Sequence, residues 1–160
     1  MTFPIFLGEI LPLLKRNFDL NEKAVSKCDY KVTELDFFWE EFPAEIEQCS
    51  HQCDIILAAD VVYDKSITIH FFKTLQTLLS LSPKTAYIAI EKRQHAGNEG
   101  EIIAPNYEIF LQELSFLNGT VLNNKLKVSV VSIAPNFKQY FKYSRVAELN
   151  LFQITSEFNQ

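Results

Sequence analysis

Apolar residues at three- and four-residue spacing predict the helices of this chain. The first helix runs from Glu9 to Leu20, where Pro12 is tolerated because it lies near the start. A second helix can be capped by Asp64 or Ser66 and is stopped by Pro83. Its apolar face comprises Ile67, Phe71, Leu75, Leu78 and Leu79. The pattern therefore predicts two amphipathic helices in the first half of the chain.

Continuous apolar runs predict the strands around these helices. Tyr30 to Leu35 is a short strand candidate, and Thr85 to Ile90 has the composition of a buried strand. Cys53 to Ala59 is the pattern of a central parallel strand that is covered on both faces. A third helix follows and can end at Asn118-Gly119. Its inner face comprises Tyr107, Phe110, Leu111, Leu114 and Leu117.

Two successive strands are predicted near the end of the chain, from Lys125 to Ile133 and from Arg145 to Ile154. Helices between the earlier strands imply right-handed parallel crossovers, whereas two strands in succession imply an antiparallel hairpin on the sheet edge. The predicted fold class is α/β. At 160 residues one domain is expected, and the stretch from Arg93 to Gly100 is its most flexible interior loop by composition.

Composition and charge argue against several kinds of binding surface and cellular location. The formal charge is −5 without a basic stripe, which argues against a nucleic-acid surface. The longest apolar runs are far below the ~20 residues of a membrane span, and no secretory signal is apparent. Cys28, Cys49 and Cys53 are predicted to be free thiols in a reducing compartment. With His51 they could bind zinc, but the paired C-x2-C spacing is absent, so no metal is predicted.

Residues that follow the strands are the candidates for function, because an open α/β sheet binds its ligand beyond the carboxyl ends of the strands. Asp36 and Phe37 follow the first strand candidate and suit an adenine amine and ring. Taken alone, the segment favours the alternative of a turn acid beside a core aromatic, because aromatic residues are mostly packing residues. The charged run Glu91-Lys92-Arg93 follows the strand Thr85 to Ile90. It could border a substrate channel or lie on a solvated face.

The segment Leu57 to Asp64, LAADVVYD, is the most informative of these places. Small residues that end at Ala59 allow a cofactor to approach the backbone, and Asp60 and Tyr63 face the crevice before the next helix. A helix-capping role explains one of the acids Asp60 and Asp64 but leaves the D-x-x-Y spacing unexplained.

LAADVVYD, KSITIHFFKTLQTLL, EKR and RVAELNLFQI occur in the order found in methyltransferase family 16, and the chain resembles that family from about Gly8 to Phe152. The family comprises class I, seven-stranded, S-adenosylmethionine-dependent protein-lysine methyltransferases. The resemblance implies a Rossmann-like sheet whose final strand inserts antiparallel beside its neighbour. It also implies methyl transfer to a protein substrate, with no direct contact to nucleic acid or membrane, in the nucleus and also the cytoplasm.

The same resemblance assigns roles to individual residues. Asp36 and Phe37 match the L-D-W pattern that lies against the adenine, with Phe in place of Trp. Ala59 and Asp60 would contact the cofactor, S-adenosylmethionine. Asp60 and Tyr63 match the D-x-x-Y element near the methyl donor, where they would act as the catalytic residues.

Two elements of the family are not visible in this sequence. The glycine-rich E-x-G-x-G turn is absent, since the glycines are Gly8, Gly97, Gly100 and Gly119. In place of an acid for the ribose, the sequence reads Phe3 to Leu7. Residues 1–160 are therefore expected to be the C-terminal part of a single methyltransferase domain that lacks the first strands. The alternative function is that of a catalytically inactive fragment or isoform acting as a protein-binding module.

Overall fold

The chain divides into two compact units in a computed structural model, Met1–Asp36 and Phe37–Gln160. The structure describes residues 7–25, 27, 30–96, 102–133, 138, 142, 144 and 148–159. Cys28, residues 3–6 and residues 97–100 of the predicted flexible loop lie outside this set. The interpretation of residues 1–160 as part of one domain stays a prediction.

The first unit is built from two helices, α1 (Leu7–Leu20) and α2 (Glu22–Val25). Helix α1 begins two residues before the predicted start and keeps Pro12 in its second turn. After the helices, the ring of Tyr30 stacks on Phe18 with 4.5 Å between centroids, and its hydroxyl donates a hydrogen bond to Asp19 at 3.3 Å. These contacts hold the end of the unit against α1.

The predicted strand at Tyr30 to Leu35 is wrong, because these residues have no regular secondary structure. A strand requires a neighbour to complete its backbone hydrogen bonds. The described residues of the first unit include no strand that could supply them. The apolar pattern is therefore present here without a sheet.

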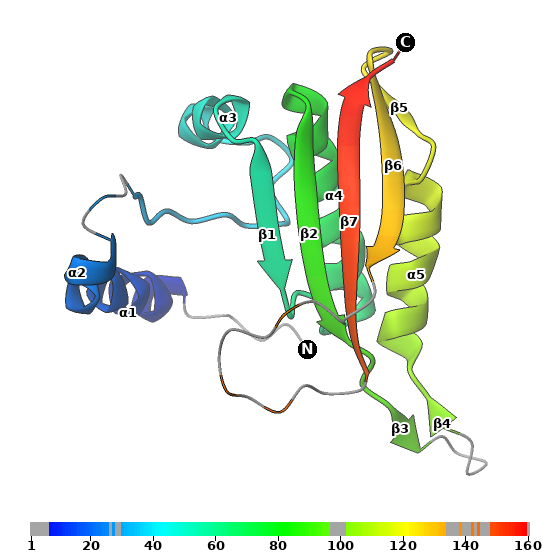
Figure 1. The fold of residues 1–160 in the computed structure, drawn as a ribbon, viewed down its shortest axis with the longest axis horizontal. Helices are drawn as coiled ribbons and strands as arrows, with labels where there is room; N and C mark the ends of the chain where they lie inside the picture. The colour runs from blue at the N-terminus through cyan, green and yellow to red at the C-terminus, as the bar shows by residue number, and fades with distance from the viewer. Residues whose placement is uncertain are drawn as a thin grey trace. The chain divides into compact units, whose positions relative to one another are not determined.

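The second unit contains a five-stranded sheet with the order β1-β2-β7-β6-β5 (Figure 1). Its strands are β1 (Ile55–Ala59), β2 (Lys84–Glu91), β5 (Val121–Leu122), β6 (Leu126–Ile133) and β7 (Leu149–Phe158). A separate two-stranded pairing joins β3 (His95–Ala96) to β4 (Ile102–Ile103). The sequence did not predict β3, β4 and β5, which are only two residues long.

Strand β7 lies between β2 and β6 and runs antiparallel to both. Strands β1 and β2 are parallel, with Ala59 opposite Ala89. The predicted antiparallel pairing of the last two long strands is confirmed. The final strand begins at Leu149, and the predicted start at Arg145 lies outside the described residues.

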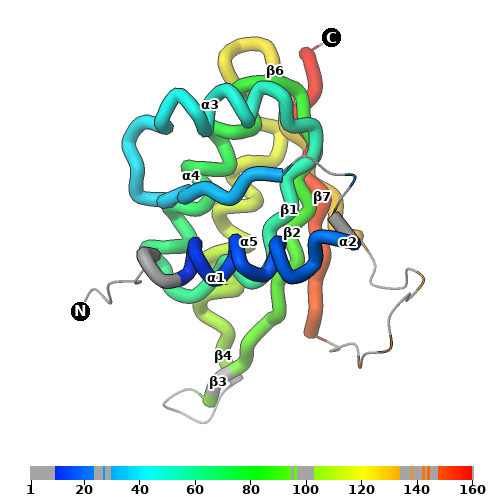
Figure 2. The backbone as a smooth tube through the Cα atoms, turned by 90° about the vertical axis from the view of Figure 1, so that its left-hand side faces the viewer, coloured from blue at the N-terminus to red at the C-terminus, as the bar shows by residue number. Residues whose placement is uncertain are grey.

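Helices α4 (Lys65–Leu81) and α5 (Pro105–Leu117) cover one face of this sheet, and α3 (Ala44–His51) packs on α4 (Figures 1 and 2). The predicted capping of α4 is confirmed at Asp64, whose carboxylate accepts a hydrogen bond from the Ile67 N–H at 2.9 Å. The helix ends before Pro83, as predicted. Leu111 was expected on the inner face of α5, but it points partly outward and is 39% exposed.

The core lies between these helices and the sheet. Its fully buried side chains are Leu75, Leu79, Ile88, Phe110, Val128 and Ile154. Alternate residues of β2 point into this core, so Ala86, Ile88 and Ile90 are buried. The core therefore fixes the register of the strand that leads to Glu91.

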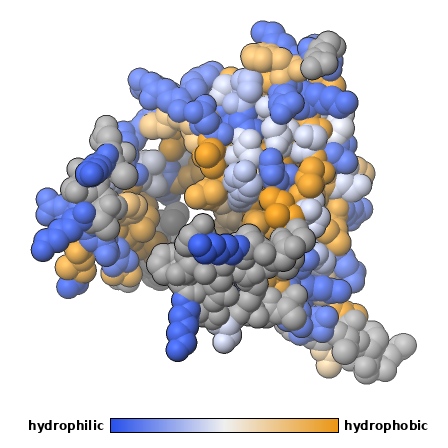
Figure 3. Space-filling model, viewed as in Figure 1, coloured by the Kyte–Doolittle hydropathy of each residue, from blue (hydrophilic) through white to orange (hydrophobic). Residues whose placement is uncertain are grey.

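No helix of the described residues 37–159 covers the opposite face of the sheet, which faces the viewer in Figures 1 and 3. Apolar atoms are visible there between polar ones (Figure 3). Ile55 and Leu57 of β1 are 58% and 78% exposed, and β1 is an edge strand of the described sheet. The predicted burial of this strand on both faces is wrong. Among the described helices, none is long and apolar enough to cross a membrane.

Candidate active site at the carboxyl ends of β1 and β2

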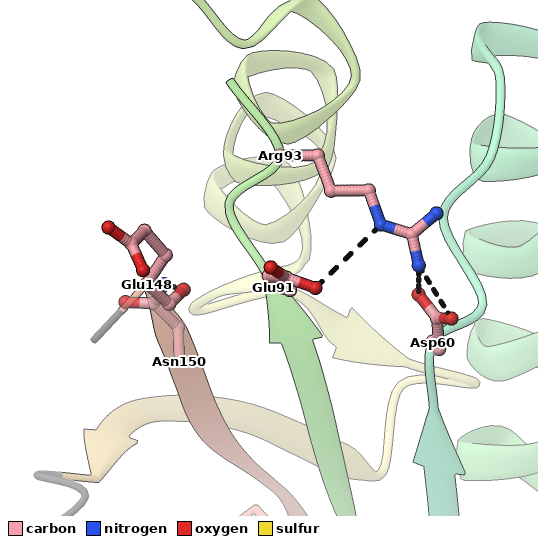
Figure 4. A network of polar contacts seen from close by, with 5 residues as sticks. All are labelled: Asp60, Glu91, Arg93, Glu148 and Asn150. Carbon is pink, nitrogen blue, oxygen red and sulfur yellow. Dashed lines mark hydrogen bonds and ion pairs between the residues drawn. The ribbon is translucent and has the colours of Figure 1, made fainter. Parts of the chain in front are cut away.

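A network of charged side chains lies where β1 and β2 end (Figure 4). The Nη2 of Arg93 donates hydrogen bonds to both carboxylate oxygens of Asp60, each at 2.8 Å. The Nε of Arg93 lies 3.9 Å from a carboxylate oxygen of Glu91. Because parallel neighbours end at the same sheet edge, residues 33 positions apart meet here.

The backbone holds Asp60 in a defined position. Its N–H donates a hydrogen bond to the Ala89 carbonyl at 3.0 Å, which extends the pairing of β1 with β2 by one residue. Its φ is +53°, in the left-handed region that Asp tolerates better than most residues. The chain therefore turns away from the sheet at Asp60, and Ala59 before it is exposed.

A cavity of about 200 Å³ lies beside this network. It is lined by Val62, Tyr63, Ile90, Glu91, Arg93, Pro105, Asn106 and Tyr107. The side-chain amide of Asn106 donates a hydrogen bond to the Tyr63 carbonyl at 2.7 Å, which ties the start of α5 to the segment after β1. The side chain of Tyr63 is 56% exposed, so it remains accessible to a ligand.

The far side of the cavity is formed by Tyr107, whose pKa is raised by burial. The ammonium group of Lys92 lies 5.7 Å from the centre of the Tyr107 ring, within the range of a cation–π contact. The backbone N–H of Lys92 donates to the Glu148 carbonyl at 3.0 Å, which joins the end of β2 to the start of β7. Glu91 and Arg93 thus line the cavity. Lys92, which lies between them, ties the end of β2 to the start of β7.

The two acids of LAADVVYD have different roles. Asp64 caps α4, and Asp60 makes an ion pair with Arg93. The capping interpretation therefore holds for Asp64 alone. The structure brings together Asp60, Tyr63, Glu91 and Arg93 at the carboxyl ends of β1 and β2.

Asp36 and Phe37 fall on either side of the boundary between the units, so each is placed within its own unit. The ring of Phe37 packs against Phe71 of α4 with 5.5 Å between centroids, and it is partly buried against the core. A packing role accounts for this side chain. The adenine-binding roles of Asp36 and Phe37 stay predictions.

The cysteine-rich segment forms no metal centre within the described part of the chain, where no three His, Cys, Asp or Glu side chains gather. Cys49 and Cys53 are free thiols, and the Cys53 thiol donates to the Ile55 carbonyl at 2.8 Å.

The sequence did not identify Asn106 and Tyr107 as part of this site. They follow Pro105 in the first turn of α5, and their positions depend on how that helix packs beside β2. The only feature of the sequence that could have indicated a role in the site is a polar residue next to an aromatic residue at the start of a helix. That signal is weak, because such pairs are common at helix starts.

A family model described as lysine methyltransferase matches residues 7–101, more than half of the chain. The match spans Asp60, Tyr63 and Arg93. The chain belongs to methyltransferase family 16. Within that family, the order β1-β2-β7-β6 and the antiparallel insertion of β7 confirm the predicted Rossmann-like methyltransferase sheet.

Two relatives are both named methyltransferase-like protein 22. The mouse protein is 28% identical over 93% of this chain and 42% of its own length. The human protein is 28% identical over 94% of this chain and 41% of its own length. The chain thus spans about two fifths of the length of these relatives.

The cavity beside Asp60 is too small by itself to enclose a cofactor as large as S-adenosylmethionine. Ligand pockets of that kind measure about 300–1,000 Å³, whereas the cavity beside Asp60 measures about 200 Å³. Ala59 and Asp60 present one wall of a possible site at the exposed end of β1. The described residues contain no glycine-rich turn to form the facing wall.

Proposed function

We propose that this chain forms part of an S-adenosylmethionine-dependent methyltransferase that acts on lysine side chains of proteins. The observation that carries the proposal is the family match, which spans the charged network at the ends of β1 and β2. The protein works on its substrate in the nucleus and the cytoplasm. The mouse and human relatives support the methyltransferase class, since both are named methyltransferase-like protein 22.

The chain's own residues suit the binding of a lysine amine. The carboxylates of Asp60 and Glu91 attract the ammonium group, and the exposed hydroxyl of Tyr63 can accept or donate a hydrogen bond beside them. An amine must lose its proton before it can act as a nucleophile. The guanidinium of Arg93 is permanently charged, and a like charge nearby favours the neutral amine.

Arg93 is a positioning residue in this proposal. Its guanidinium holds both oxygens of Asp60, so the carboxylate is fixed in orientation. The pair is half exposed, with side-chain exposures of 49% for Arg93 and 52% for Asp60. An incoming lysine can therefore reach Asp60 without first unfolding any structure around it.

The first test is calorimetric titration of the chain with S-adenosylmethionine. Because the described residues supply one wall of the site, binding should be measurable but weaker than micromolar, and weaker than in mouse methyltransferase-like protein 22. Micromolar binding by the chain would contradict the view that the described residues supply only one wall of the site. No heat at millimolar cofactor would favour the alternative function, an inactive protein-binding module.

The second test is transfer of a radiolabelled methyl group from S-adenosylmethionine to lysine in cell-extract proteins. Asp60→Asn and Tyr63→Phe should each lower incorporation at least about tenfold, because positioned polar groups contribute factors of this size or more. Tyr87→Phe, on β2 and away from the cavity lining, is the matched control and should retain the starting rate. Equal loss in all three variants, or label on residues other than lysine, would refute the assigned roles.

A further inference from the structure

A second, larger cavity lies on the helical side of the second unit and shares no residue with the site at Asp60. Its volume is about 890 Å³. One wall is the segment 38–47, which carries the aromatic residues Phe38, Trp39 and Phe42 and the acidic residues Glu40, Glu41 and Glu47. We call this the aromatic–acidic groove. The other wall is α4, and Figure 2 shows the segment after Phe37 turning beside α4 and leading into α3.

Contacts with α4 hold the groove open in a defined shape. The Thr74 hydroxyl donates a hydrogen bond to the Phe37 carbonyl at 3.4 Å. The Phe38 ring stacks on the His70 imidazole with 4.2 Å between centroids. At the other end, the Ile46 N–H donates to the Pro43 carbonyl at 2.8 Å, and Ile46 is buried. The groove is therefore anchored at both ends, which lowers the entropy cost of binding a ligand.

The charge of the groove is predominantly negative. Glu40, Glu41 and Glu47 are all exposed, and no lysine or arginine among the described residues forms an ion pair with them. Lys73 is the one lysine in the lining, against these three carboxylates. A cationic ligand would find both unpaired carboxylates and aromatic faces here.

We propose that the aromatic–acidic groove binds a segment of a partner protein that is rich in arginine and lysine. Guanidinium and ammonium groups pair with carboxylates, and they also bind over the faces of Trp and Phe rings. The methylene stems of these side chains cover apolar surface while their charges stay in water. Nucleic acid does not fit, because its phosphates would be repelled by the same carboxylates.

The groove and the cavity beside Asp60 have no residue in common, but the groove lining includes Phe37, which the family resemblance assigns to the adenine. The experiment measures peptide binding without S-adenosylmethionine, so it does not depend on methyl transfer. Trp39 is the only tryptophan of the chain and lies in the groove, so its fluorescence reports directly on occupation. The probe is a synthetic peptide of alternating arginine and serine, and the comparison peptide alternates glutamate and serine. The arginine peptide should change Trp39 emission saturably, and its affinity should fall as salt rises.

Matched variants test whether the peptide binds to the carboxylates of the groove or is attracted by the negative charge of the whole chain. The triple variant Glu40→Gln, Glu41→Gln, Glu47→Gln should bind the arginine peptide about tenfold or more weakly, because each carboxylate contributes a modest ion pair. The control triple variant Glu113→Gln, Glu148→Gln, Glu157→Gln makes the same charge change elsewhere and should bind normally. Phe38→Ala should also weaken binding while the Trp39 signal is retained, and circular dichroism checks that every variant folds.

Four binding results would overturn the proposal, and one result on oligomeric state would do so as well. The binding results are no saturable change with the arginine peptide, an equal response to the glutamate peptide, equal weakening in both triple variants, and an equal response to duplex DNA. Concentration-dependent dimerisation that disappears in the groove triple variant alone would also overturn it, because a second copy of the chain would then be the occupant.

Discussion

Strands β1 and β2 are parallel neighbours with similar apolar sequences, yet they lie in very different surroundings. Ile88 in the middle of β2 points toward the helices and is completely buried, whereas Leu57 of β1, which lies opposite Tyr87, points to the other face and is 78% exposed. Strand β2 has β1 on one side and β7 on the other, and β1 has a partner on one side only. An apolar run thus indicates a strand, but the place of that strand in the sheet and the face that each side chain takes decide how deeply the side chain is buried.

The largest effect is expected from truncating β2 in the core. Ile88→Ala should lower the free energy of unfolding by about 2–5 kcal/mol, because it removes buried methyl groups and leaves a cavity. The matched change Leu57→Ala should cost less than about 0.5 kcal/mol, as for other exposed positions. Urea denaturation of both variants measures the difference. Equal losses would mean that β1 is buried in solution by another surface.

A second expectation concerns the free edge of β1. We predict that the isolated chain self-associates, because neither charge nor proline blunts the edge from Ile55 to Ala59. Leu57→Lys should shift the chain toward monomer in sedimentation velocity, since an edge lysine opposes strand pairing. Ser129→Lys on β6 adds the same charge away from that edge and should leave association unchanged. A monodisperse wild-type monomer with cooperative melting above about 50 °C, ordinary for a mesophile domain, would contradict this expectation.

Lys84 at the start of β2 gives a smaller, pH-dependent effect. Its side chain is 4% exposed, its ammonium group donates to the Ser50 carbonyl at 2.9 Å and to the Ser82 hydroxyl, and desolvation lowers its pKa. The folded chain therefore binds this proton less tightly than the unfolded chain does. Stability should rise as the pH increases from the lowered pKa toward the ordinary value near 10.5.

The measurement is the free energy of unfolding of Lys84→Met and of the wild type between pH 7.5 and 10.5. The rise with pH should be smaller in Lys84→Met than in the wild type. Lys127→Met, at an exposed position of β6, should leave the rise intact. An identical pH dependence in wild type and Lys84→Met would show that the lysine is solvated in solution.

The smallest effect on stability is expected at the end of β1. Asp60→Asn keeps a residue that tolerates the left-handed backbone and removes the charge that pairs with Arg93. Because both partners are half exposed, the loss should be below about 1 kcal/mol. A double-mutant cycle with Arg93→Gln measures the coupling energy. A coupling energy well above 1 kcal/mol would mean that the pair supports the fold as well as the site.

The sequence predicted the elements whose signal is local. Asp64 and Pro83 bracket α4 in the sequence as they do in the structure, and the continuous apolar run of β2 and the apolar alternation of β6 identified these two strands. Helix α3 was missed, because AEIEQCSH buries only Ile46 and Ser50 and so shows almost no periodic apolar face. The two-residue strands were missed because they are too short to carry any period.

The candidate site was predictable in its positions but not in its pairings. Residues that follow neighbouring parallel strands are expected to lie close together at the carboxyl ends of those strands. This expectation identified Asp60 and the run Glu91-Lys92-Arg93 as candidates. The ion pair between them depends on the turn at Asp60 and on the register that sets Ala59 opposite Ala89. No local pattern encodes a contact across 33 residues. Pairing across that distance is a property of the assembled sheet.

The insertion of β7 also determines the order in which the sheet can form. It is the last of the five strands in the chain, yet it occupies the place between β2 and β6. Ser156 pairs with Lys84, 72 positions earlier, so closing this part of the sheet requires a long loop. Until β7 arrives, β2 and β6 cannot be joined, and two incomplete sheets with open edges persist during synthesis. Folding of this unit should therefore be slow and limited by its final strand, because non-local pairing carries its entropy cost first.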